Sequence, residues 1–336
     1  MCSSDLTAGG NDTIRLQSGS EVNGGIQAGA GDDTLYIQKN ALLTGEVAMG
    51  DGNDQVSIED GATVTSNIAL GSGVNTLTVQ KDASMTGTVV FASDSTNTVT
   101  VNGAVMGFSG GDATTNNTIV LSGDAVRGGG VGYWTQMDVY NYAGGYWTQL
   151  KVFVVRDLNL TNANDTVIIG NNAFVNNISL GGGNDKLTIN QGAGIGYDYV
   201  STADWQTRGN VIPATINLGT GHDILILNSQ LGTNVNVITE DDGGDVIVLG
   251  ADMTILDNQL LVGSTNNVLV VANGRQVSFS DMVSLGNFLS GNGKYDAIYL
   301  SMNAIIRAGD EVVIQNYTGT LASEVILVSG APTEIP

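Results

Sequence analysis

Five glycine-rich turns that end in aspartate are the residues of this sequence best suited to chemistry. They are GGND (9–12), GAGDD (29–33), GDGND (50–54), GGGND (181–185) and GTGHD (219–223). Asp12, Asp33 and Asp54 are spaced by 21 residues, so a repeat of that length stacks their carboxylates in one column, with Asp32 and Asp51 adding charge nearby. Carboxylates about 5 Å apart repel by about 1 kcal/mol in water and by more at a lower dielectric. Calcium, which prefers several oxygen ligands, would relieve this repulsion.

A metal-free interpretation of the same column stays open at this point. Aspartate side chains in ordinary turns point into water and cap nearby backbone amides. The column later changes to Asn75, Asn97 and Asn117, which indicates an amide ladder that has the same structural role without a metal.

These turns resemble the calcium-binding RTX (hemolysin-type) repeats of secreted bacterial proteins. The resemblance implies that calcium is bound by backbone carbonyls and by the matching aspartates, which are Asp12, Asp33, Asp54, Asp185 and Asp223. It covers the turns alone, because RTX repeats recur about every nine residues, whereas one turn occurs here in every 21 residues.

Two segments, 124–160 and 190–214, concentrate the aromatic residues, and the first contains the near-duplicates GYWTQMDVY (132–140) and GYWTQLKVF (145–153). The duplication predicts a β-hairpin that projects from the rest of the molecule. Aromatic side chains on such a hairpin suit stacking on a glycan or anchoring a protein partner. The candidates are Tyr133, Trp134, Tyr146, Trp147 and Trp205. The alternative is that these residues fold down and cover neighbouring strands.

Catalysis has weaker support. Asp12 and Asp54 lie two repeats apart, near the upper separation of the carboxylate pair of an inverting glycosidase. An active site is a singular constellation, however, whereas these turns repeat. The one histidine, His222, lies in a turn, and the 11 Lys and Arg residues are scattered. We therefore expect no catalytic residues, and a polysaccharide lyase or hydrolase is the alternative.

An internal repeat predicts the elements that position the turns. Residues 8–91 divide into four blocks of 21 residues that align without a gap, and a shorter fifth block follows. Each block contains three pairs of small or apolar residues spaced by two, such as Leu35/Ile37, Ala41/Leu43 and Val47/Met49. This spacing places both side chains of a pair on one face of a strand. Since no block can bury its apolar face alone, we predict an all-β, single-stranded parallel β-helix, a solenoid that we expect to be right-handed.

The repeat also predicts the organisation of the chain, with on the order of a dozen rungs in total. We expect regular rungs over 7–123, the hairpin insertion over 124–160, irregular rungs over 161–285 with an insertion at 190–214, and late rungs or a cap over 286–336. Lys39, Asp60 and Lys81 occupy equivalent block positions and predict an exposed column of alternating charge. Residues 1–6 (MCSSDL) resemble a translated sequencing adapter, so we expect them to be artefactual and the natural N-terminal sequence to be missing.

Composition restricts the partners of the chain. The 33 Asp and Glu residues outnumber 11 Lys and Arg residues, which gives a net charge of −22 and disfavours nucleic acid and anionic membrane surfaces. No apolar run reaches the ~18–20 residues that cross a bilayer, so we expect no membrane insertion.

Together these features predict an extracellular or cell-surface scaffold or adhesin. Its architecture is similar to that of autotransporter passengers and large RTX-type adhesins. Calcium is the expected cofactor, a glycan or a host or cell-surface protein is the expected partner, and self-association is a further expectation. The alternatives are a polysaccharide-active β-helix enzyme and a structural surface-layer or filament protein.

Overall fold

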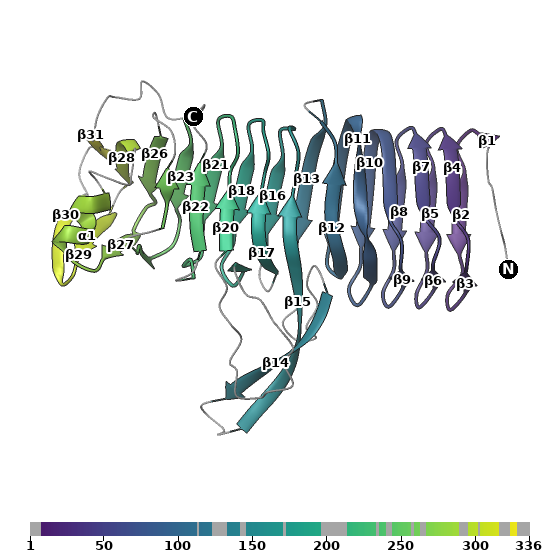
Figure 1. Cartoon of the computed structure of the whole chain (residues 1–336), viewed down its shortest axis with the longest axis horizontal. Helices are drawn as coiled ribbons and strands as arrows, with labels where there is room; N and C mark the ends of the chain where they lie inside the picture. Colours follow the sequence, from purple (N-terminus) through teal and green to yellow (C-terminus); the bar gives the residue numbers. More distant parts are fainter. Residues whose placement is uncertain are drawn as a thin grey trace.

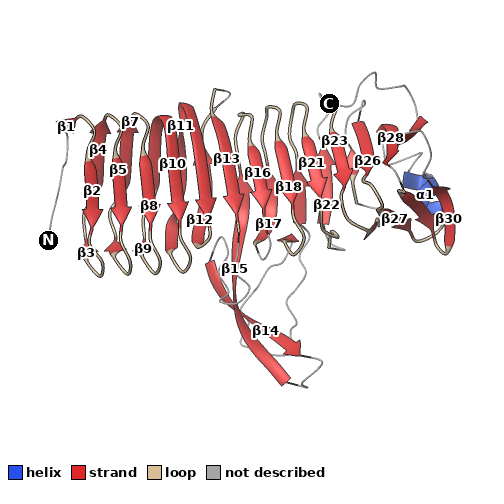
Figure 2. Ribbon diagram, turned by 180° about the vertical axis from the view of Figure 1, so that it is seen from behind, coloured by secondary structure: helices blue, strands red, loops and turns tan. Residues whose placement is uncertain are grey.

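The computed structural model describes residues 8–112, 114–122, 133–141, 146–170, 173–195, 214–232, 235–239, 244–256, 259–262, 267–288, 295–301, 303–315 and 323–327. Over these residues the chain is an all-β parallel solenoid, which confirms the predicted fold class. The rungs stack along one long axis, from the purple N-terminal strands to the yellow C-terminal strands (Figure 1). The one helix among the described residues, α1 (Met282–Asn287), lies at the C-terminal end of the stack (Figure 2).

The first face of the solenoid carries the longest continuous stack of parallel pairings. In order these strands are β2 (Thr13–Leu16), β5 (Thr34–Ile37), β8 (Gln55–Ile58), the end of β10 (Ile68–Val79), the end of β11 (Ser84–Val101), β13 (Asn116–Leu121), β16 (Thr166–Ile169), β18 (Lys186–Ile189), β21 (Ile224–Leu227), β23 (Val246–Leu249), β26 (Asn267–Val271) and β28 (Tyr295–Ser301). The number of rungs is close to the predicted dozen.

Two further faces complete each rung. The second face has short strands, namely β3 (Glu21–Val22), β6 (Leu42–Leu43), β9 (Thr63–Val64), the start of β11 and β12 (Ala104–Gly110), then β19 (Gly194–Ile195), β24 (Met253–Thr254), β27 (Gln276–Phe279) and β29 (Ile305–Ala308). The third face has β1 (Ala8–Gly9), β4 (Ile26–Ala30), β7 (Val47–Asp51), the start of β10, the middle of β11, the end of β15 (Tyr146–Asn159), β17 (Phe174–Ser179), β20 (Ala214–Asn217), β22 (Val235–Thr239) and β25 (Leu261–Val262).

The register of the regular rungs follows the repeat of the sequence. Leu35 lies opposite Val56, and Val56 lies opposite Leu77, so equivalent positions of successive blocks stack directly. Their side chains point inward and are fully buried, and they belong to one apolar core that extends from Leu16 to Ala308. Because a buried leucine in such a core contributes about 2–5 kcal/mol relative to alanine, the stacked interior is a main source of stability.

The aromatic duplicates form an antiparallel hairpin of β14 (Tyr133–Asn141) and β15, with Tyr140 opposite Trp147. The hairpin projects from the side of the solenoid (Figure 1). The final part of β15 pairs in parallel with β17, with Val154 opposite Phe174, so one strand runs from the hairpin into the solenoid. Trp205 and residues 1–6 lie outside the described residues.

Antiparallel pairing appears again at the C-terminal end. β28 pairs antiparallel with β31 (Ser323–Leu327), and β29 pairs antiparallel with β30 (Glu311–Gln315). Before these strands, Asp281 is the N-cap of α1, and its side chain accepts a hydrogen bond from the Ser284 backbone N–H at 2.7 Å. These strands end the regular parallel stacking of the chain.

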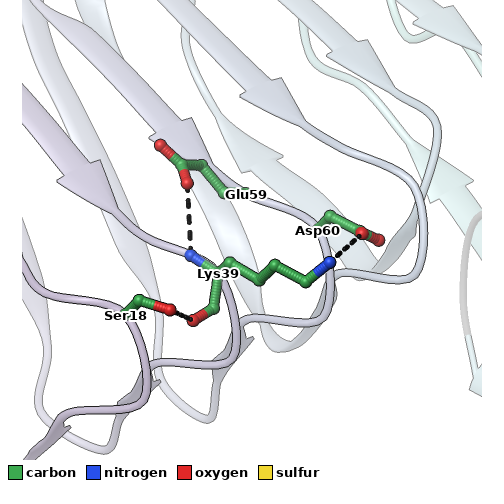
Figure 3. Close-up of polar contacts among 4 residues, drawn as sticks. All are labelled: Ser18, Lys39, Glu59 and Asp60. Carbon is green, nitrogen blue, oxygen red and sulfur yellow. Dashed lines mark hydrogen bonds and ion pairs between the residues drawn. The ribbon is translucent and has the colours of Figure 1, made fainter.

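The first pair of the predicted charge column is present on the surface (Figure 3). Lys39 Nζ lies 3.1 Å from Asp60 Oδ2, one rung away, and both side chains are largely exposed. The Lys39 backbone is also held by both neighbouring rungs: its N–H donates to Glu59 Oε2 and its carbonyl accepts from Ser18 Oγ.

Candidate metal site

The aspartate that ends each glycine-rich turn points into the solenoid. It lies two residues before the first inward apolar residue of the next strand, as Asp33 lies two residues before Leu35, so it shares the inward face. We call this column the inner seam; it consists of Asp12, Asp33, Asp54, Asn75, Asn97, Asn117, Asp165, Asp185, Asp223, Asp245 and Asn267. Apart from Asp12, which is partly buried, every member is at most 3% exposed.

Most inner-seam side chains accept a backbone hydrogen bond from the preceding rung, whereas Asn97 and Asn117 accept from the side-chain amide of the preceding asparagine. Asp12 N–H donates to Asp33 Oδ1 at 2.7 Å, Asp33 N–H donates to Asp54 Oδ1 at 2.8 Å, and Asp54 N–H donates to Asn75 Oδ1 at 3.0 Å. The same bond recurs after the hairpin, for example from Asp185 N–H to Asp223 Oδ1 at 2.8 Å. Since a buried backbone N–H without a partner is costly, an Asp or Asn acceptor is needed at every corner.

The predicted column therefore exists, but its carboxylates are not in water. Asp33 and Asp54 are 1% and 2% exposed, so the interpretation in which they splay into solvent is wrong for these residues. The expectation that they cap turn amides is confirmed, because they accept backbone N–H groups. The capped amides belong to the neighbouring rung, which makes the seam a link between rungs.

The second carboxylate oxygen distinguishes the aspartates from the asparagines. The Oδ2 atoms of Asp33, Asp54, Asp165 and Asp185 are buried without a hydrogen-bond partner. Burial raises the pKa of Asp185 to about 8, with further contributions from Asp223 and Asp165. Burial also raises the pKa of Asp165 to about 6 and raises that of Asp54. A buried anionic oxygen with no donor needs either a proton or a cation.

The residue that directly precedes each inner-seam residue, for example Asn11, Asp32 or Asn53, belongs to a second column that we call the outer seam. Its hydrogen bonds run in the opposite direction along the solenoid axis. Asp32 N–H donates to Asn11 Oδ1 at 2.9 Å, and Asn53 N–H donates to Asp32 Oδ1 at 2.8 Å. Here the side chain accepts from the following rung, whereas inner-seam side chains accept from the preceding rung. After the hairpin, His222 N–H donates to Asn184 Oδ1 at 3.0 Å, and His222 Nδ1 accepts from Gly244 N–H at 3.2 Å. His222 thus takes the place of an outer-seam asparagine.

Asp32 and Asp51 do not join the buried carboxylates. Both are exposed, and Asp51 Oδ1 accepts from Ser72 Oγ at 2.8 Å on the outside of the turn. Within the described residues, no group of three or more His, Cys, Asp or Glu side chains converges as a metal cluster. The structure brings together Asp12, Asp33 and Asp54 in one run of rungs, and Asp185 and Asp223 in another.

Two members of the inner seam, Asp165 and Asp245, are not among the residues that the turn motif selects. Asp165 ends the turn TNAND and Asp245 ends DDGGD, and neither turn has the Gly-X-Gly spacing. Each nevertheless comes one residue before a strand of alternating apolar residues, TVII or VIVL. An Asp or Asn two residues before an inward apolar position is therefore the better sequence signal.

The glycines of the turns permit the close stacking of successive rungs. A Cβ at Gly50 would lie 1.7 Å from the Gly29 carbonyl oxygen, and a Cβ at Gly219 would lie 1.7 Å from the Gly181 carbonyl oxygen. Gly50 and Gly219 also have φ values of +103° and +90°, a conformation that favours glycine. Close approach of backbone to backbone thus requires glycine here.

Comparisons with known proteins give little beyond the architecture. No protein-family model matches the sequence, and no curated protein matches it. One similar solved structure is that of a hyperactive, Ca²⁺-dependent, β-helical antifreeze protein from an Antarctic bacterium. The two are 15% identical, the match covers 99% of this chain and 93% of that chain, and the TM-score is 0.46. Within the described residues, no helix is long and apolar enough to span a bilayer.

Proposed function

We propose that this chain is part of an extracellular or cell-surface scaffold of the adhesin type, whose inner seam binds calcium. The observation that supports calcium is the set of buried Oδ2 atoms without partners at Asp33, Asp54, Asp165 and Asp185. Their structural task, accepting one backbone N–H, needs only Oδ1, and Asn75 performs it for Asp54. The second oxygen is thus available for another purpose.

The donor set of the seam suits a hard cation. Carboxylate oxygens of successive rungs and the backbone carbonyls of the glycine-rich turns are the ligand types that calcium prefers. Calcium would supply the positive charge that the buried oxygens lack, and Asp33, Asp54, Asp165 and Asp185 would hold it. Calcium is millimolar outside cells, the concentration at which extracellular calcium modules are typically occupied, so a calcium-binding seam is consistent with the proposed location.

Calorimetry and thermal melting of the whole chain test the calcium proposal. We expect heat of binding and a higher melting temperature in millimolar calcium than in chelator, with a smaller response to magnesium, which needs a tighter octahedral site. The control variant Asp51→Asn removes an exposed carboxylate and should leave both signals unchanged. Absence of binding heat together with identical melting curves would exclude calcium as the stabilising ligand.

For the partner, we propose that the projecting hairpin contacts a glycan or a protein at a host or cell surface. The register places Trp134 opposite Phe153 and Trp147 opposite Tyr140, which puts these positions on the same face of the hairpin. Aromatic residues gathered on one face suit stacking on sugars or anchoring in a protein pocket. A glycan array and cell-binding assays should show binding that a Trp134→Ser/Trp147→Ser double variant loses, while melting of the solenoid stays unchanged.

We propose further that the chain is not an enzyme. The acid pair that the repeat spacing suggests, Asp12 and Asp54, is not arranged as an open catalytic pair, because Asp54 is 2% exposed and accepts a hydrogen bond from the Asp33 backbone. His222 is engaged with Gly244 of the next rung. Incubation with acidic polysaccharides should release no unsaturated product and no reducing ends; release of either would overturn this proposal.

A further inference from the structure

The inner seam has two acidic blocks separated by an amide block, and we infer that calcium occupies the acidic blocks and not the amide block. The first acidic block contains Asp12, Asp33 and Asp54, the amide block contains Asn75, Asn97 and Asn117, and the second acidic block contains Asp165, Asp185, Asp223 and Asp245. This inference rests on the proposed calcium binding and adds where in the seam the ions lie.

The amide block satisfies its own polar atoms. Asn75 Nδ2 donates to the Gly71 carbonyl at 3.0 Å and to Asn97 Oδ1 of the next rung at 3.2 Å. Asn97 Nδ2 donates to Asn117 Oδ1 at 2.9 Å, and Asn117 Nδ2 donates to Asp165 Oδ1 at 2.9 Å. Asn75 Nδ2 and Asn97 Nδ2 therefore each lie between two oxygens and donate to both, and Asn117 Nδ2 donates to the first aspartate of the next block.

The acidic blocks place an oxygen where the amide block has that nitrogen. Gln55 lies opposite Thr76, so the residues before them, Asp54 and Asn75, occupy equivalent positions of successive rungs. Both use Oδ1 to accept a backbone N–H from the preceding rung. The atom of Asp54 equivalent to Asn75 Nδ2 is then Oδ2, which is buried and has no partner. The same holds for Asp33, Asp165 and Asp185.

This exchange of nitrogen for oxygen indicates which of the blocks can bind a cation. In the amide block a cation would face Nδ2 hydrogens that already point at the available oxygens, so binding would break hydrogen bonds and add repulsion. In the acidic blocks a cation would lie beside the Oδ2 atoms of Asp33, Asp54, Asp165 and Asp185, which have no donor. Calcium suits this environment because it is bound by carboxylate and carbonyl oxygens.

The amide block also separates the two acidic blocks electrically. Four rung steps lead from Asp54 to Asp165 through the three asparagines, and at about 4.8 Å each they amount to about 19 Å. This distance is about four times the spacing of adjacent rungs, so the direct Coulomb interaction between the nearest ions of the two blocks is about a quarter of that between ions on adjacent rungs. We therefore infer that the two blocks bind calcium independently, which reduces the repulsion that one continuous row of ions would have.

Reciprocal exchanges at the boundary of the first block test the inference. Asn75→Asp extends the first acidic block by one rung and should raise the calcium stoichiometry, measured by equilibrium dialysis, by about one ion. Asp54→Asn replaces Oδ2 by a donor and should lower the stoichiometry. The matched control is Asn53→Asp, which adds the same charge on the exposed outer seam and should leave the stoichiometry unchanged.

Hydrogen exchange of the unmodified chain gives a second measurement that needs no variant. Calcium should increase the protection of β5 and β8, and of β18 and β21, whereas the ends of β10 and β11 and strand β13 should change least. In Asp54→Asn, the calcium response of β5 and β8 should fall while that of β18 and β21 persists. Equal responses along the whole seam, or unchanged stoichiometry in both exchanges, would overturn the division into blocks. If the unmodified chain binds no calcium at all, the proposed function fails as well, so the two failures are distinguishable.

Discussion

The rungs before the hairpin and the rungs after it differ in the regularity of their length and in the outward residues of the first face. Before the hairpin the inner seam advances by 21 or 22 residues per rung as far as Asn97, whereas after it the steps from Asp165 to Asn267 are 20, 38, 22 and 22 residues. The outward positions of the first face also change, from polar residues such as Thr34 and Thr76 to aliphatic ones such as Ile224 and Val248.

The interior is nevertheless the same in both regions. Leu77 and Leu225 are fully buried at equivalent positions, and Asp54 and Asp185 each accept a backbone N–H from the preceding rung. The comparison teaches that the register of the solenoid is set by the close turn, the Asp or Asn at the corner and the inward apolar pair. The number of residues between turns is free to vary.

Matched glycine substitutions give the most severe test of that conclusion. Gly50→Ala before the hairpin and Gly219→Ala after it should each destabilise the protein by about 3 kcal/mol or more, because both force a Cβ against a carbonyl and strain a positive φ. Unfolding by denaturant measures the effect. Gly107→Ala, where a Cβ meets nothing within 4 Å, is the control and should be close to neutral. A large loss at only one of the two turns would show that the regions are not built alike.

A second prediction concerns the pH dependence of stability in the absence of metal, which should differ between the two regions. Burial raises the pKa of Asp165 to about 6 and that of Asp185 to about 8, so the folded metal-free chain holds protons there that the unfolded chain releases near its ordinary value of 3.8. Such groups stabilise the fold fully at pH below the unfolded pKa, and this stabilisation is lost as the pH rises through the folded pKa. In chelator, stability should fall between about pH 4 and about pH 8 by on the order of a few kcal/mol.

Melting curves in chelator across this pH range measure the effect, and Asp185→Asn should remove much of it. Calcium should reverse the trend, because it binds the ionised carboxylate and competes with the proton. Hydrogen exchange should show the loss first in β18 and β21, after the hairpin. A melting temperature that rises with pH in chelator would contradict the assignment of buried, protonated aspartates.

The two regions also show how much of the structure can be predicted from the sequence alone. The gapless 21-residue blocks predict the register of β2, β5 and β8, since a period of two fixes the inward face of every strand. The same two-residue alternation places Asp33 on the inward side together with Leu35. An aspartate in a glycine-rich turn is ordinarily solvated, so the turn motif alone predicts an exposed side chain, whereas Asp33 is buried.

Other properties of the seam depend on contacts between rungs that are remote in sequence. The bond from Asn117 to Asp165 spans 48 residues, and no local motif indicates it. The opposite hydrogen-bond directions of the inner and outer seams depend on which neighbouring rung donates the backbone N–H to each side chain. That His222 substitutes for an asparagine follows only from its bond to Gly244, because a lone turn histidine has no sequence signature for this role.

Substitutions in the outer seam test whether the rungs before and after the hairpin are built alike, and their expected effects on stability are smaller. His222→Ala removes the acceptor of the Gly244 N–H, and Asn53→Ala removes the acceptor of the Val74 N–H. Each should cost about 1 kcal/mol or less, because both sites are exposed and water replaces part of the bond. His222→Asn should retain most of the stability, since an amide oxygen serves the outer seam elsewhere. Chemical denaturation measures the stability of all three variants. A much larger loss of stability for His222→Asn than for His222→Ala would contradict the interpretation that His222 takes the place of an outer-seam asparagine.

The smallest effect is expected for the Lys39–Asp60 charge pair of the regular region. Lys39 and Asp60 have side chains that are 60% and 44% exposed, so their 3.1 Å contact is screened by water and salt. Lys39→Met keeps much of the aliphatic side chain and should change stability by about 0.2–1 kcal/mol at low salt and by less at high salt. A double-mutant cycle with Asp60→Asn isolates the coupling between the two charges. Since the backbone of Lys39 is held by Ser18 and Glu59 whatever its side chain, we expect the rung to keep its register in every member of the cycle. A coupling of several kcal/mol would mean that surface charge helps to set the register, and the regular region would then differ from the later rungs in the forces that stack it.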